Sequence, residues 1–279
     1  MLPSIKDLNQ TDRVLHSLAQ LIALTGTNQL AAQPDDSQAN MIWNSEQTRL
    51  EGQPFEHKSQ RIKLVIDLPT FSLQFLDEND SMLATFGAEN KTPAETKAWW
   101  QTVLYDWGFN PTTPLNYQLD TDPIPLETQY TRPAGLNSWA DWRTMANQTL
   151  ANLNKVSAQT SDIRIWPHHF DTGVYYAISD ELAKERAAIW AGYAIADRVS
   201  AEPYFYLSGY NRQHPVDFTK ASKLATGYWL AGSEWQGACL PVSQLIEPEQ
   251  ITQFLTESYT WLAVNADFTT TIIHNGGTA

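Results

Sequence analysis

The fold class is decided by residues 61–87, which read RIKLVIDLPTFSLQFLDENDSMLATFG. Apolar and polar side chains alternate over 62–67 and again over 71–75, as they do in strands that bury one face. A turn at 77–80 and a returning apolar stretch at 82–86 follow. The pattern predicts an antiparallel meander, because consecutive strands joined by tight turns pair in opposite directions.

Helix signals flank the meander on both sides. Thr92, Pro93 and Glu95 occupy the N-cap, N1 and N3 positions of a capping box and predict the start of a helix. The spacing of apolar residues predicts three more helices, over 12–25, 137–157 and 248–263. In the first of them, Thr11 is placed to cap the N-terminus and Gly26 to end the helix. We therefore predict an α+β fold of antiparallel β-sheets with about three long helices packed on them.

The chain is expected to form two intimately joined halves, residues 1–158 and 159–279. The first is an α+β half and the second is β-rich with a terminal helix, although a single fused domain is an alternative. Strands of the second half are predicted at residues 162–170, 172–178, 187–196, 202–208, 226–232 and 235–242.

Two long segments lack regular periodicity. Residues 27–60 are polar and irregular, with one weak strand at 40–44. Residues 110–135 are rich in proline and predict an extended crossing with one strand at 115–119.

Composition excludes several classes of partner. The net charge is −13, with 18 basic and 31 acidic residues and no cluster of Lys and Arg, so neither nucleic acid nor an anionic membrane is an expected partner. No apolar run reaches the roughly 18 residues of a membrane span, and residues 1–7 lack the apolar core of a signal peptide. We therefore expect an acidic, aromatic-rich, cytoplasmic protein. The single cysteine, Cys239, is expected to be a small buried apolar residue.

The most unusual stretch is RIWPHHFD, residues 164–171, which places two histidines near a carboxylate. If it is a strand, His169 and Asp171 share one face at a separation of roughly 6.5–7 Å, and Trp166 and His168 share the other. This spacing lets a divalent metal lie between His169 and Asp171. In the metal hypothesis, His168 is a further ligand, and Glu202 or His214 completes the set. The same spacing also suits a general base, His169, that Asp171 orients. Ligand binding without chemistry is a third interpretation, and histidines hydrogen-bonded within the sheet are a fourth.

A second candidate follows about thirty residues later, in EPYFY at residues 202–206. Glu202 precedes a proline, and Tyr204 and Tyr206 share a strand face. The structural interpretation is an aromatic core strand. In the functional hypothesis, Glu202 joins His169 and Asp171 as a catalytic residue, and both tyrosines bind ligand together with Trp166 and His168.

The favoured functional hypothesis is a small-molecule-binding protein or an enzyme with an aromatic-lined pocket near the His-His-Phe-Asp segment. The alternatives are a non-enzymatic interaction or scaffold protein, and a metal-dependent hydrolase or oxygenase. A divalent metal is the cofactor that the histidines would suit, and no nucleotide-binding motif is present.

The RIWPHHFD and EPYFY strings together resemble an uncharacterised family of mainly bacterial proteins, known as a domain of unknown function. The resemblance covers most of the chain and includes the meander followed by a tryptophan-containing helix. Distant members resemble this chain in the Phe-Asp pair rather than in the paired histidines, which implies an architectural role for Asp171. The family implies no activity.

Overall fold

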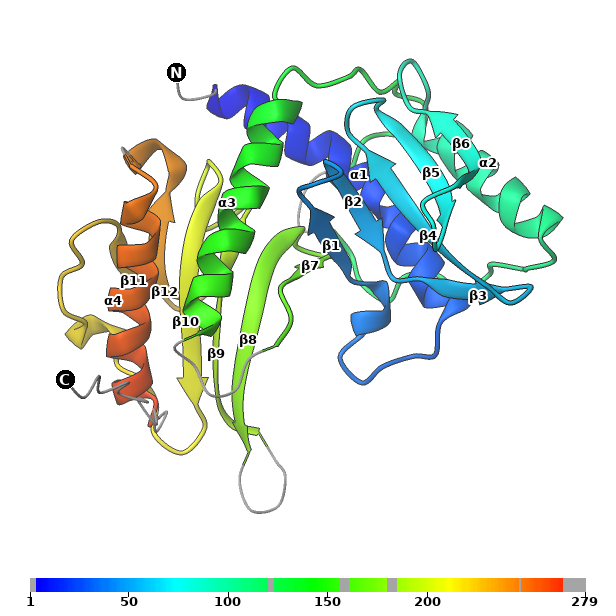
Figure 1. Ribbon diagram of the computed structural model, residues 1–279. Helices are drawn as coiled ribbons and strands as arrows, with labels where there is room; N and C mark the ends of the chain where they lie inside the picture. The colour runs from blue at the N-terminus through cyan, green and yellow to red at the C-terminus, as the bar shows by residue number, and fades with distance from the viewer. Residues whose placement is uncertain (1–3, 120–122, 156–160, 180–184, 246, 268–279) are drawn as a thin grey trace, which may run out of the picture. The chain divides into compact units, whose positions relative to one another are not determined.

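The computed structural model describes residues 4–119, 123–155, 161–179, 185–245 and 247–267 (Figure 1). The chain divides into two compact units. Unit 1 comprises Met1–Thr144 with Arg164–Thr172, and unit 2 comprises Met145–Ile163 with Gly173–Ala279. The boundary between them lies within a helix, and residues 164–172 belong to unit 1, although our division placed them in the second half.

The α+β fold class is confirmed. The described residues contain twelve strands in antiparallel arrangement and four α-helices, which lie at the four places where the sequence predicts helices. None of these helices in the described residues combines the length and the apolar character that a membrane span requires.

The sheet of unit 1 contains the predicted meander. Its strands lie in the order β7 (Arg164–Trp166), β1 (Met41–Asn44), β2 (Arg49–Gly52), β4 (Gln60–Asp67), β5 (Ser72–Asp77) and β6 (Met82–Gly87), and β3 (Phe55–His57) also pairs with β4. The weak strand at 40–44 is confirmed as β1. Strands β2 and β3 were missed, because they are only four and three residues long and β2 carries charged side chains.

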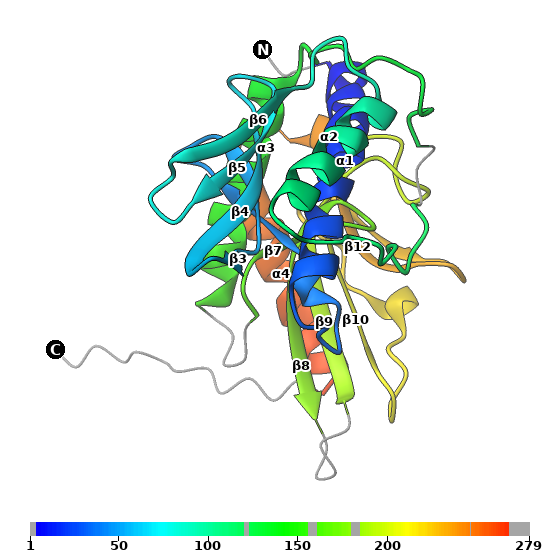
Figure 2. The ribbon, with the colours of Figure 1, turned by 90° about the vertical axis from the view of Figure 1, so that its right-hand side faces the viewer.

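Two helices pack on one face of this sheet, α1 (Ile5–Gln29) and α2 (Pro93–Asp106), and Figure 2 shows them side by side. The capping box of α2 is confirmed. Thr92 Oγ1 accepts from the backbone N–H of Glu95 at 3.2 Å, and the Glu95 carboxylate accepts from the N–H of Thr92 at 2.9 Å.

Helix α1 is longer at both ends than the predicted 12–25. Thr11 does not cap it but lies in its second turn, where the hydroxyl donates to the carbonyl of Asp7 at 2.6 Å. Gly26 does not end it either. A Cβ at Gly26 would lie 2.0 Å from the carbonyl oxygen of Gln38. Glycine is therefore required there because a distant backbone segment approaches the helix, and not because the helix terminates.

Unit 2 contains five of the strands, in the order β8 (Asp171–Ser179), β9 (Glu185–Ala194), β10 (Tyr204–Asn211), β12 (Gln236–Pro241) and β11 (Tyr228–Ala231). Helix α4 (Glu249–Asn265) packs against β10, and α3 (Leu136–Asn154) contributes its C-terminal turns to this unit. Cys239 is fully buried, as predicted, and this burial raises the pKa of its thiol to about 11.

Two local predictions are wrong. Residues 115–119 form no strand, and the described part of the segment before α3 is irregular, since its prolines cannot donate to a ladder. Helix α3 ends at Asn154, three residues before the predicted end, and residues 156–160 lie outside the described part of the chain.

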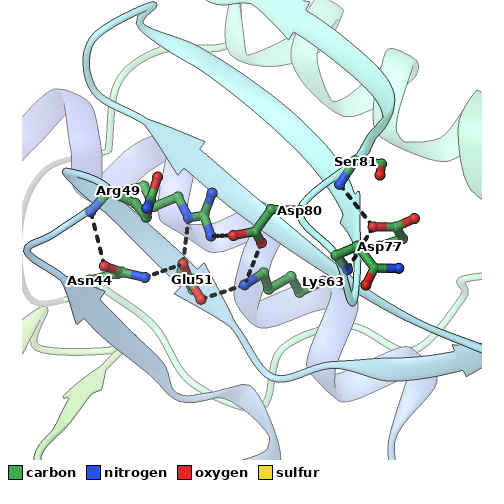
Figure 3. Close-up of polar contacts among 9 residues, drawn as sticks. Asn44, Arg49, Glu51, Lys63, Asp77, Asp80 and Ser81 are labelled. Carbon is green, nitrogen blue, oxygen red and sulfur yellow. Dashed lines mark hydrogen bonds and ion pairs between the residues drawn. The ribbon is translucent and has the colours of Figure 1, made fainter.

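The face of the unit 1 sheet that points away from Leu50 and α1 carries a network of charged side chains (Figure 3). Glu51 on β2 accepts hydrogen bonds from Arg49, from Lys63 Nζ at 2.9 Å and from Asn44 Nδ2 at 2.8 Å. Asp80 closes the network by accepting from Arg49 Nη2 at 2.7 Å. The network connects β1, β2 and β4 to the turn between β5 and β6.

Candidate functional site

The RIWPHHFD segment is not a continuous strand. Strand β7 ends at Trp166, residues 167–170 form a turn, and β8 begins at Asp171. The N–H of Phe170 donates to the carbonyl of Trp166 at 2.7 Å, and Phe170 has a φ of 55°. Pro167 cannot donate to a strand ladder, so the chain turns there. The expected alternation, with His169 and Asp171 on one strand face, is therefore wrong.

The turn is fastened to α1 from one side. His16 Nε2 lies 2.8 Å from the carbonyl oxygen of Pro167, and Gln20 Nε2 donates to the same oxygen at 3.0 Å. The His16 ring also stacks on Phe170, with 4.8 Å between centroids and 5° between planes. These contacts fix the turn at two points, its first carbonyl and its last side chain.

A buried ion pair holds the turn from the other side. Arg143 on α3 is fully buried and donates to the carbonyl of Phe170 at 2.7 Å and to Thr172 Oγ1 at 2.8 Å. Its guanidinium lies 3.5 Å from Asp12, which also accepts from Trp139 Nε1 at 2.7 Å. Burial raises the pKa of Asp12 to about 6, although Arg143 and Trp139 oppose the shift.

We expect the histidine under the turn to make unit 1 sensitive to acid. Burial lowers the pKa of His16 to about 4 from its ordinary 6.5. The stability that neutral His16 contributes is therefore present above pH 6.5 and is lost as pH falls towards 4. Relative to His16→Gln, wild type should lose about 2 kcal/mol of unfolding free energy between about pH 7.5 and about pH 5.

The measurement is denaturant unfolding of both proteins at the two pH values. Asp12 contributes in the opposite sense, because its raised pKa gives stability that is lost as pH rises through about 6. This contribution cancels in the comparison, since both proteins keep Asp12. His214→Gln, at an exposed histidine, is the matched control. A pH-independent difference between wild type and His16→Gln would show that His16 is not titrating in the folded protein.

A cavity of about 430 Å³ opens beside the turn, within unit 1. Three segments form its walls: the end of α1 with the loop after it, residues 113–117, and residues 166–168. The lining residues are Thr27, Ala32, Asp35, Asp36, Gln38, Ala39, Asn40, Thr113, Pro114, Asn116, Tyr117, Trp166, Pro167 and His168.

The second wall, residues 113–117, is fastened to α1 by side chains of the helix. Asn28 makes two hydrogen bonds of 2.9 Å with the backbone of Thr113, one through each end of its amide. The hydroxyl of Tyr117 donates to Gln20 Oε1 at 2.7 Å. Gln20 thus joins two walls, because its amide nitrogen also holds the turn at Pro167. Hydrogen bonds within the protein therefore fix the positions of these two walls.

Asn40 has an exceptional position in the cavity wall. It is 1% exposed, and neither Nδ2 nor Oδ1 of its amide has a hydrogen-bond partner within the part of the chain that the structure describes. Leaving a buried amide unsatisfied costs about 1–3 kcal/mol, so native proteins provide a partner in nearly every case. Both amide atoms are buried, so Asn40 lines the cavity through its other atoms.

Only some of the predicted residues meet at this cavity. Trp166 and His168 line it, and the ring of His168 lies 5.7 Å from that of Tyr117 and 6.3 Å from that of Trp166. His169 is exposed and Asp171 is buried, and neither is among the lining residues.

Glu202, Tyr204 and Tyr206 belong to unit 2, so unit 1 by itself does not contain the predicted single cleft. The Glu202 carboxylate accepts from the backbone N–H and the hydroxyl of Ser243 at 2.8 and 2.7 Å. Tyr204 and Tyr206 are buried together with Cys239, and the Tyr204 hydroxyl donates to Asp197 Oδ2 at 3.0 Å. These contacts match the interpretation of a core strand.

The proposed metal ligands do not form a cluster. His168, His169 and Asp171 are all described, and no group of three or more His, Cys, Asp or Glu side chains in the described ranges has the geometry to hold a metal ion. The arrangement gives no support to a metal site at this segment.

No family model, no curated protein and no solved structure matches this chain. The resemblance to an uncharacterised bacterial family therefore stays a prediction, and the site is argued from its geometry.

Sequence reasoning missed the cavity residues outside the histidine segment, in particular Asn40, Asp36 and Tyr117. Asp36 lies in the segment 27–60, which the sequence shows only as polar and irregular, and Tyr117 lies in a predicted strand that does not form. Nothing in the sequence signals that residues 35–40 and 113–117 meet the turn, because each contact spans dozens of residues.

Proposed function

We propose that this protein binds a small polar molecule in the unit 1 cavity lined by Trp166, His168 and Tyr117. The observation that carries the proposal is the cavity itself. Its volume of about 430 Å³ falls within the roughly 300–1,000 Å³ of known ligand sites, and its walls combine aromatic rings with a few polar side chains.

Two features support binding over a purely structural role. Hydrogen bonds from α1 fasten two of the walls, so a ligand would meet a rigid site and lose little free energy to ordering it. The lining also places the rings of Trp166 and Tyr117 beside the carboxylates of Asp35 and Asp36, so apolar and polar parts of a ligand would both find contacts.

Ligand-observed NMR with a library of small polar fragments tests this proposal. We expect a subset of fragments to bind wild type and to bind Trp166→Leu about tenfold more weakly, because the indole forms part of the wall. Trp99→Leu is the matched control, since Trp99 is also half-buried in unit 1 but packs on Phe75 and Phe86, away from the cavity lining.

Two results would contradict the proposal. One is the absence of any fragment that binds wild type at millimolar concentration. The other is a set of fragments whose binding is weakened equally by Trp99→Leu and Trp166→Leu, which would place their site elsewhere.

A further inference from the structure

We infer that the ligand of the unit 1 cavity is a small organic cation with one positive charge, an ammonium compound whose charge lies beside Asp36 and whose carbon groups contact the aromatic rings of the lining. This inference rests on the proposed function and specifies its ligand class.

The charged side chains of the lining all have one sign. Asp35 and Asp36 line the cavity, and neither Lys nor Arg is among the lining residues that the structure describes. Asp35 has a counter-charge outside the lining, because Arg164 Nη1 lies 3.7 Å from its carboxylate. Within the described part of the chain, the Asp36 carboxylate accepts only from neutral amides, from Asn116 Nδ2 at 2.9 Å and from Gln38 Nε2 at 3.4 Å. The cavity wall therefore carries one negative charge that these residues leave without an opposite charge.

This charge on Asp36 selects the sign of the ligand. A molecule that enters the cavity displaces water from the carboxylate. A neutral molecule supplies no opposite charge in return, and removing water from an unpaired charge is unfavourable. An anion adds repulsion, whereas a cation in contact with the carboxylate is attracted to it. The net charge of −13 also concentrates cations near the protein surface. The cavity therefore favours a ligand with one positive charge.

The aromatic residues favour an organic cation over a metal ion. The ring of His168 lies 5.7 Å from that of Tyr117 and 6.3 Å from that of Trp166, and all three residues line the cavity. The face of an indole or phenol ring attracts a cation within about 6 Å and also contacts the carbon groups bound to it. A metal ion needs several oxygen, nitrogen or sulfur ligands, and the described ranges contain no group of three His, Cys, Asp or Glu suited to one. An ammonium compound with alkyl groups matches both the carboxylate and the rings.

Asp36→Asn tests the role of the charge with little change in shape. Asp36 has a φ of 56°, a left-handed conformation that asparagine tolerates better than most residues do. Its amide oxygen can still accept from Asn116. Asp106→Asn is the matched control, because it changes the net charge equally at an exposed residue at the end of α2, outside the cavity lining.

The experiment is a ligand-observed NMR titration with two series of matched compounds. Choline is compared with its uncharged carbon analogue neohexanol, and butylamine is compared with butanol and with butyrate. We expect at least one of the two cations to bind wild type and Asp106→Asn equally, and at least tenfold more tightly than its uncharged analogue. This cation should bind at least tenfold more weakly to Asp36→Asn and to Trp166→Leu. The comparison of a cation with its uncharged analogue uses wild type alone, so it decides the inference even if a variant fails to fold.

Each other outcome overturns the inference. Equal binding of a cation and its uncharged analogue would show that charge does not select the ligand, and tighter binding of butyrate than of butylamine would assign the cavity to anions. A cation that binds Asp36→Asn as well as wild type would occupy another site. Equal weakening by Asp36→Asn and Asp106→Asn would assign the effect to the net charge of the protein. If fragments bind at Trp166 but neither cation binds at millimolar concentration, the ligand class is wrong and the proposed function stands. If nothing binds, both fail.

Discussion

Replacing Arg143 with methionine should destabilise unit 1 by about 3–5 kcal/mol, because it leaves the buried side chain of Asp12 without its charged partner. Arg143 is fully buried, with Asp12 at 3.5 Å and hydrogen bonds to Phe170 and Thr172. The guanidinium also packs against the rings of Trp139 and Phe170, with 4.8 Å to each centroid. Methionine keeps part of this packing and loses the charge and all its hydrogen bonds.

Denaturant unfolding monitored by tryptophan fluorescence measures this effect. Asp12→Asn combined with Arg143→Met should cost less than the sum of the two single changes, because the pair is then removed together. Arg61→Met is the control, since Arg61 is 61% exposed and lies 3.8 Å from Glu56, so its removal should change stability by less than about 0.5 kcal/mol. A loss below about 1 kcal/mol for Arg143→Met would show that the buried pair contributes nothing net to the fold.

Replacing Glu51 with leucine should lower the free energy of unfolding by about 2–3 kcal/mol, measured by denaturant unfolding. Glu51 is 5% exposed and accepts from Arg49, Lys63 and Asn44, so its removal leaves two cations and an amide without their shared acceptor (Figure 3). We expect a smaller effect than for Arg143, because Arg49 and Lys63 both keep Asp80, whose side chain is 42% exposed.

The difference in unfolding free energy between wild type and Glu51→Leu should depend on pH, which gives a second check. Burial acts to raise the pKa of Glu51, but hydrogen bonds from Lys63, Arg49 and Asn44 outweigh it and keep the pKa low. A carboxyl with a lowered pKa contributes stability above its unfolded pKa and loses it as pH falls through the folded value. The difference between wild type and Glu51→Leu should therefore shrink in acid. Glu56→Leu, at a carboxylate that is 69% exposed, is the control. Equal effects of the two substitutions would refute a special role for the network.

The sequence by itself determined the features that depend on neighbouring residues. The capping box at Thr92 and Glu95 closes within one helical turn, and the meander needs only alternation and short turns. The α+β class follows from these two patterns. The burial of Cys239 was also predictable, because a small apolar side chain in an apolar strand has little reason to be exposed.

Tertiary structure decided the features that depend on distant segments. Gly26 looked like a helix end, but the backbone at Gln38 is what requires a glycine there. The strand expected over residues 162–170 forms only at Arg164–Trp166, and the turn that follows is held by His16, Gln20 and Arg143, all distant in sequence. A hydrogen-bond partner or a close approach of this kind leaves no local periodicity in the chain.

The candidate site shows the same division. The sequence singled out the stretch around Trp166 and His168 because paired histidines beside aromatics are unusual, and both residues line the cavity. It could not supply Asn40 or Tyr117, since the cavity exists only where three separate segments meet. The sequence also grouped Glu202, Tyr204 and Tyr206 with the histidines, whereas the fold assigns them to the other compact unit. Residue types indicate chemistry, but only the packing of the chain determines which of those residues share a site.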